Sequence, residues 1–196
     1  MQGELRFGEV GKSGKRILVD TQILKRQLCV QIGAFLEYPV NDFREMLQIL
    51  AGQIEPISWK ASSYLKDFFA RMKRMELEMW QEYYVQTFDL MPRCSLYISV
   101  HLFGEESFKR AELMAGLKIA YERQGALETT ELPDHLAVIL KQNTLLDDEE
   151  WSEFVTMCIL PALPVMISKL EKNGNPYAFV LKTIQELLVE VEKAHV

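Results

Sequence analysis

The feature that most constrains the fold is a long stretch without any residue that breaks helices. No glycine or proline occurs between Ile57 and Met91, and apolar side chains recur there with the three- and four-residue spacing of an amphipathic helix. The stretch is longer than one average helix. The charged residues from Arg71 to Arg74 therefore predict a joint, with one helix on each side of it.

Other segments carry the same spacing together with signals that begin or end a helix. An apolar stripe from Leu24 to Leu36 stops before Pro39, because the residue before a proline avoids the α region. Asp147 and Glu150 have the spacing of a capping box, which predicts the start of a further helix. No alternating strand pattern and no internal repeat is visible in the sequence.

Prolines predict further boundaries. We expect Pro56 and Pro133 in first turns, where a helix accepts proline, and we expect Pro161 and Pro164 to interrupt an apolar helical face. The patterns predict an all-α, single-domain bundle of about nine or ten helices over residues 20–196. Residues 1–19 show no period, and we expect a flexible leader there.

Charge and hydropathy exclude several classes of function. The chain has 22 Lys and Arg against 28 Asp and Glu, a net charge of -6, and no basic stripe, so we expect no nucleic-acid partner. The longest uncharged stretch, Phe154 to Ser168, is shorter than the roughly 20 residues of a membrane span. We therefore expect no direct membrane insertion. An acidic surface is compatible with basic partners, including basic peptides, but does not by itself indicate them.

The cysteines and glycines indicate no cofactor. Cys29, Cys94 and Cys158 are far apart, and no CxxC or HxxxH spacing occurs, so we expect neither a metal nor another cofactor. An odd count without a signal peptide favours reduced, buried thiols and a cytoplasmic location. Gly11-Lys12-Ser13 resembles the end of a phosphate-binding loop, but Arg6 stands where that loop needs its first glycine.

Four segments resemble signatures of a known family. Tyr84–Leu90 reads YVQTFDL, Ser95–Gly104 reads SLYISVHLFG, Glu131–Leu140 reads ELPDHLAVIL, and Asn175-Pro176-Tyr177 precedes the last apolar stripe. In this order they resemble the nitrate reductase delta-subunit (NarJ-type) family, which is related to the TorD-type maturation chaperones of molybdopterin enzymes.

This resemblance implies a TorD/NarJ-like chaperone and not an enzyme. Members of the family bind the apo catalytic subunit of a molybdenum oxidoreductase through its N-terminal signal or signal remnant. They hold that subunit in the cytoplasm until the molybdopterin cofactor is inserted and the complex assembles. The implied partner is thus the apo catalytic subunit of a molybdenum oxidoreductase, with respiratory nitrate reductase as the first candidate. We expect the chain itself to be a monomer or a weak dimer.

The strongest candidate for client binding is a segment of six consecutive residues: Glu131, Leu132, Pro133, Asp134, His135 and Leu136. Carboxylates beside apolar side chains would complement a peptide in which arginines precede a hydrophobic run. The alternative is a scaffold role, in which Asp134 favours a helix N-terminus and His135 satisfies a nearby carbonyl group. Catalysis or metal binding would need a nucleophile or further ligands near this cluster.

Two more residues are candidates for client contact. Asp89 follows an aromatic-rich helix and either contacts a basic peptide or ends its own loop. His101, one turn beyond Tyr97, either joins the site or is a satisfied core histidine. Two other classes of function stay open from the residues alone. One is a small hydrolase or nucleotide-dependent factor that uses Asp134 and His135, and the other is a structural accessory subunit of a membrane reductase.

Overall fold

The computed structural model describes residues 10–90, 92–123, 125 and 130–192, and within them it contains helices and no named β-strand. The elements are α1 (Val10–Gly33), η1 (Ala34–Leu36), α2 (Arg44–Ile54), α3 (Trp59–Met72), α4 (Leu77–Phe88), α5 (Ile98–Phe103), α6 (Phe108–Arg123), α7 (Leu136–Lys141), η2 (Asn143–Leu145), α8 (Asp148–Phe154), η3 (Val155–Ile159), α9 (Leu160–Glu171) and α10 (Tyr177–Glu192). The all-α prediction is confirmed, and so is the joint after α3.

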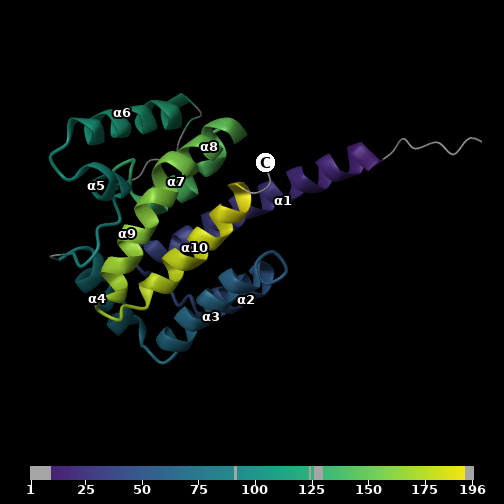
Figure 1. The fold of residues 1–196 in the computed structure, drawn as a ribbon. Helices are drawn as coiled ribbons and strands as arrows, with labels where there is room; N and C mark the ends of the chain where they lie inside the picture. Colours follow the sequence, from purple (N-terminus) through teal and green to yellow (C-terminus); the bar gives the residue numbers. More distant parts are fainter. Residues whose placement is uncertain (1–9, 91, 124, 126–129, 193–196) are drawn as a thin grey trace, which may run out of the picture.

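Helix α10 lies at the centre of the bundle. It packs against α3, α9 and α1, while α2 packs against α3, α1 against α7, and α5 against α9. Figure 1 shows α2 and α3 at one end of the molecule and α5, α6 and α8 at the other. The last helix therefore contacts helices from both the first and the last parts of the chain, and α1 also meets α7 directly.

An aromatic cluster fixes the start of α10. The side chain of Tyr177 is completely buried, and its hydroxyl accepts a 2.8 Å hydrogen bond from Nε1 of Trp80. Its ring centroid lies 4.8 Å from that of Phe88 and 5.3 Å from that of Phe68. Asn175 Oδ1 accepts from the backbone N–H of Tyr177 at 3.0 Å. The Asn-Pro-Tyr segment thus holds α10 against α3 and α4.

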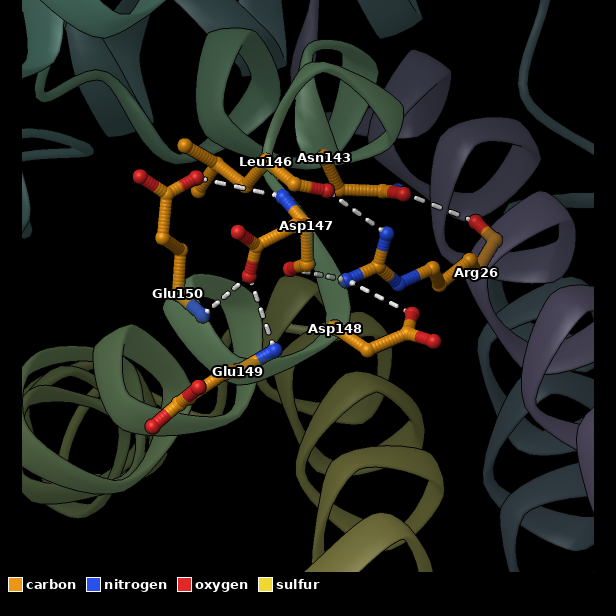
Figure 2. A network of polar contacts seen from close by, with 7 residues as sticks. All are labelled: Arg26, Asn143, Leu146, Asp147, Asp148, Glu149 and Glu150. Atoms are coloured by element: carbon orange, nitrogen blue, oxygen red, sulfur yellow. Dashed lines mark hydrogen bonds and ion pairs between the residues drawn. The ribbon is translucent and has the colours of Figure 1, made fainter.

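A polar network ties α1 to the start of α8. The guanidinium of Arg26 donates to the carbonyl oxygens of Leu146 and Asp147 at 2.9 and 2.8 Å, and lies 3.4 Å from Asp148 Oδ1 (Figure 2). The carboxylate of Asp147 accepts from the N–H of Glu150, whose side chain accepts from the N–H of Asp147. This confirms the predicted capping box, which satisfies helix N–H groups that have no partner within the helix.

Two proline predictions about helix starts are wrong. Pro56 precedes α3, because Ser58 caps that helix by accepting from the N–H of Ala61 at 3.2 Å. Pro133 lies in a turn, and α7 begins only at Leu136. In α3 the capping residue Ser58 decides where the helix begins. In α7 the helix begins three residues after Pro133, without a side-chain cap.

The predicted interruption at Pro161 and Pro164 is also wrong, since α8, η3 and α9 form one continuous helical run from Asp148 to Glu171. The segment Val155–Ile159 between them is a π-helical turn. Such a turn departs from the regular ladder of backbone hydrogen bonds just before Pro161, whose nitrogen has no hydrogen to donate. The chain can therefore continue as a helix.

In the described part of the chain, this run is the one helix long and apolar enough to cross a membrane by length and composition. Its 24 residues include a window of mean hydropathy 1.5. Length and composition do not distinguish a span from a core helix. Here one face of α9 is buried in the bundle, through Ala162, Leu163, Met166, Ile167 and Leu170.

The first helix begins earlier than the stripe from Leu24 indicates. Helix α1 starts at Val10, so it includes residues 10–19 of the expected leader. Residues 1–9 lie outside the described residues. Gly11-Lys12-Ser13 is helical, which is not the backbone of a phosphate-binding loop.

Candidate functional site

An antiparallel bridge brings two of the signature segments together. Tyr97 pairs with His135, the N–H of Ile98 donates to the carbonyl oxygen of Asp134 at 3.0 Å, and the N–H of Leu136 donates to that of Leu96 at 2.8 Å. The chain just before α5 therefore runs beside the chain just before α7. The pairing was not expected, because neither segment has a strand pattern.

Two adjoining pockets, each about 430 Å³, open around this bridge. Asp89, Glu131 and His135 line both of them. The first pocket extends over Tyr38, Tyr84, Glu37 and Lys141, and the second over Phe88, Tyr97, Glu105 and Arg110. The end of α4, the bridge and the start of α7 thus meet at one place.

The lining of the pockets is acidic. It includes four carboxylates, from Glu37, Asp89, Glu105 and Glu131, and two cations, from Arg110 and Lys141. Lys141 Nζ lies 3.3 Å from Glu37 Oε1. Arg110 Nε lies 3.8 Å from Oδ2 of the buried Asp134. Because each cation already faces a carboxylate, the pockets favour a positively charged ligand.

The carboxylate of Glu131 influences two neighbouring ionisable groups, those of Tyr97 and Asp89. The hydroxyl of Tyr97 donates to Glu131 Oε2 at 2.6 Å. Burial, and then the negative charge of Glu131, raise the pKa of the Asp89 carboxyl above its ordinary value. Burial raises the pKa of the Tyr97 hydroxyl as well, helped by its hydrogen bond to Glu131. A cation placed between Asp89 and Glu131 would relieve this repulsion.

Asp134 does not line either pocket, but its buried side chain holds the neighbouring residues in place. Its side chain is completely buried, Oδ2 accepts from the hydroxyl of Ser99, and Arg110 Nε donates to that same hydroxyl at 3.0 Å. The hydroxyl of Tyr121 donates to the carbonyl oxygen of Pro133 at 3.4 Å. Helix α6 carries both Arg110 and Tyr121, so it is anchored to residues 133–134 near both of its ends.

His135 faces both pockets but is only 5% exposed. Its ring lies edge-on to Tyr97 with centroids 5.3 Å apart, and its Nδ1 has no hydrogen-bond partner among the described residues. Burial lowers the pKa of His135, although Glu131 and Asp134 oppose that shift. Because Nδ1 is itself buried, the imidazole contributes its ring to the pocket wall and does not present this nitrogen to a ligand.

His101 lies apart from the pocket lining. Its Nε2 is 2.8 Å from the carbonyl oxygen of Ser95, and Lys169 Nζ is 3.4 Å from its Nδ1. Burial lowers its pKa. This geometry agrees with the alternative of a satisfied core histidine. In segment 131–136, Leu132 is exposed, Pro133 is half-buried and Leu136 is completely buried.

Burial raises the pKa of the Cys29 thiol to about 12 and that of Cys94 to about 11, so neither is an activated nucleophile. Across the residues that the structure describes, no three His, Cys, Asp or Glu side chains are placed to hold a metal ion. Sequence reasoning missed Glu37, Lys141 and Arg110, which come from separate elements and carry no motif. It could have found Tyr97, which lies in the second signature segment.

The family model for the nitrate reductase delta subunit matches residues 55–178. The chain belongs to this family. The probable nitrate reductase molybdenum cofactor assembly chaperone NarJ of Bacillus subtilis (strain 168) is 29% identical over 162 residues, which are 82% of this chain and 87% of that protein. The NarJ chaperone of Escherichia coli (strain K12) is 28% identical over 163 residues, 81% of this chain and 68% of that protein.

A third relative, the probable assembly chaperone NarW of Escherichia coli (strain K12), is 25% identical over 162 residues, 82% of this chain and 68% of its own length. The family prediction is confirmed, and all four signature segments lie within the matched residues. Because these relatives of the delta-subunit family are assembly chaperones, the predictions of a chaperone and of a non-enzyme are confirmed as well. The hydrolase and accessory-subunit alternatives find no support in them.

Proposed function

We propose that this chain is a cytoplasmic chaperone that binds the apo catalytic subunit of a nitrate reductase and assists insertion of the molybdenum cofactor. Membership of the delta-subunit family and the roles of the Bacillus and Escherichia relatives support this proposal. The relatives are matched along most of this chain, so the resemblance is not restricted to one motif.

We further propose that the client's N-terminal segment is held at the two acidic pockets. The observation that carries this proposal is the pair of carboxylates, Asp89 and Glu131, that both pockets share. An arginine of the client would lie between them, because a guanidinium forms charge-assisted, often bidentate hydrogen bonds with carboxylates. The apolar residues that follow it would contact Tyr38 and Leu132, each 45% exposed beside the pockets.

In this proposal, three residues of segment 131–136 have different roles. Glu131 contacts the client, the ring of His135 forms part of the pocket wall, and Asp134 positions the segment through Ser99 and Arg110. The turn in which the N–H of His135 donates to the carbonyl oxygen of Leu132 at 3.0 Å keeps these roles separate. A rigid turn lowers the entropy that is lost when a peptide is bound.

Calorimetric titration of the client's N-terminal peptide tests this site. Glu131→Gln should weaken binding roughly 5- to 150-fold, which corresponds to the loss of about 1–3 kcal/mol from a charge-assisted hydrogen bond. Glu45→Gln, at an exposed position on α2, is the matched control and should bind as the wild type does. Thermal melts of all three proteins check that each is folded.

Unchanged affinity in folded Glu131→Gln, at both low and moderate salt, would refute the pocket as the client site. It would leave the chaperone role itself untouched. That role is tested separately by mass identification of the apo-subunit that co-purifies with the wild-type chain. Sedimentation of the purified chain would show whether it is a monomer or a weak dimer.

A further inference from the structure

A separate hollow, apolar in its lining, lies between α6 and the run formed by α8 and η3. It measures about 620 Å³. Its apolar lining comes from Leu113, Leu117 and Ala120 of α6 and from Phe154, Met157 and Cys158 of the opposite wall. We call it the α6–α8 groove. It shares no lining residue with the two acidic pockets.

Helix α6 is only partly covered by the rest of the protein. Of its 16 residues, Leu117 and Tyr121 are buried. Phe103 of α5, which also lines the groove, is 38% exposed. Across the groove, Met157 is 67% exposed. Flexible methionine side chains suit surfaces that contact apolar partners. The groove therefore leaves apolar surface available to another helix.

Gly116 lies in the middle of α6 and lines this groove. Glycine inside a helix is destabilising relative to alanine, so a contact that requires glycine would explain its presence at this position. A Cβ at this position would meet no heavy atom within 4 Å, so the protein's own packing does not require glycine there. The missing side chain does allow the backbone of another helix to approach closely.

The rim of the groove is acidic. Glu112 of α6 and Glu150 and Glu153 of α8 line it, against one cation from Lys109. An adjoining hollow of about 670 Å³ along α8 shares Glu153 and Met157 with the groove and continues over Asp148 and Glu149. A ligand that fits an apolar floor between such walls carries positive charge on its flanks.

We propose that the α6–α8 groove binds an amphipathic helix of a partner protein. The apolar face of that helix, spaced at i, i+3, i+4 and i+7, lies on the groove floor, and its flanking lysines or arginines face the carboxylates of α6 and α8. A second copy that docked through α8 would bring carboxylates against carboxylates, and docking through α6 would produce a dimer, which is one of the outcomes tested below. This proposal does not depend on the client-peptide site around Glu131.

Fluorescence anisotropy with a synthetic peptide of about 18 residues, five helical turns, tests the proposal. The probe has leucines at the stated spacing and lysines on both flanks. Gly116→Gln places an uncharged side chain in the groove without a clash, and it should weaken binding at least about tenfold. Gly52→Gln is the matched control, because a Cβ at Gly52 of α2 also meets nothing within 4 Å. It should leave binding unchanged.

A second peptide with glutamates in place of the flanking lysines should bind more weakly than the probe, and Glu131→Gln should not alter binding of the probe. Any of three results would overturn the proposal. They are equal binding by wild type and Gly116→Gln, equal binding of both peptides, or a wild-type dimer that Gly116→Gln dissociates while neither protein binds the probe.

Discussion

We expect Asp134 and Arg110 to be strongly coupled in the folded protein. Asp134 is fully buried, and the side chain of Arg110 is 19% exposed, with 3.8 Å between Oδ2 and Nε. At an effective dielectric constant of about 20, two charges at this separation attract by about 4 kcal/mol before desolvation is counted. Asp134→Asn keeps the shape and the contact with Ser99 but removes the charge. It should lower the free energy of unfolding by about 1–3 kcal/mol.

A double-mutant cycle measures this coupling directly. Urea denaturation of wild type, Asp134→Asn, Arg110→Met and the double variant gives the four free energies of unfolding. The sum of the two single losses should exceed the loss in the double variant by about 1 kcal/mol or more. Once one partner is gone, the second substitution removes no further attraction between the two side chains. Additive effects, within about 0.5 kcal/mol, would refute the reasoning. Asp134→Asn should also change client-peptide affinity far less than Glu131→Gln does.

Three further outcomes follow from the contacts described above. Tyr177→Phe should lower the free energy of unfolding by about 1–3 kcal/mol in denaturant titrations, because it leaves Nε1 of Trp80 buried without a partner. Asp147→Ala should cost about 0.5–2 kcal/mol by the same measurement, through loss of the α8 capping box. Burial lowers the pKa of His101 and His135, so the unfolded chain takes up protons first as the pH falls. Stability from these histidines should be complete above pH 6.5, the ordinary value, and decline below it, as measured by melts between pH 8 and pH 5.

The helices could be predicted because their signals are local. The stripe from Leu24 to Leu36, the charged joint at Arg71–Arg74 and the Asp147 capping box each depend on residues within a few positions of one another. One error was also local, since the Ser58 cap outweighed Pro56, whereas another arose where an unusual backbone turn decided the path of the helix. A π-helical turn at Val155–Ile159 carried the chain through Pro161, and no periodicity argument contains that possibility.

The site could be predicted only in part, for a related reason. Glu131, His135 and Asp89 were found because they lie in or beside the signature segments. Their partners were missed, since Lys141 and Glu37 are 104 positions apart and Arg110 meets Ser99 from another helix. The bridge between Tyr97 and His135 is likewise a long-range pairing in segments with no strand pattern. Such contacts exist only after the bundle has formed.

The scaffold and recognition interpretations of segment 131–136 need not compete, because they apply to different residues. Asp134 points into the protein, where it meets Ser99 and Arg110, and Leu136 is buried in the core. Glu131 is exposed at the pocket mouths, where it accepts from Tyr97. A carboxylate cannot be fully buried, paired with Arg110 and at the same time available to a client. The residue that holds α6 in place and the residue proposed to receive the client therefore have to be different carboxylates, and a short signature segment that contains both can fix the distance between them.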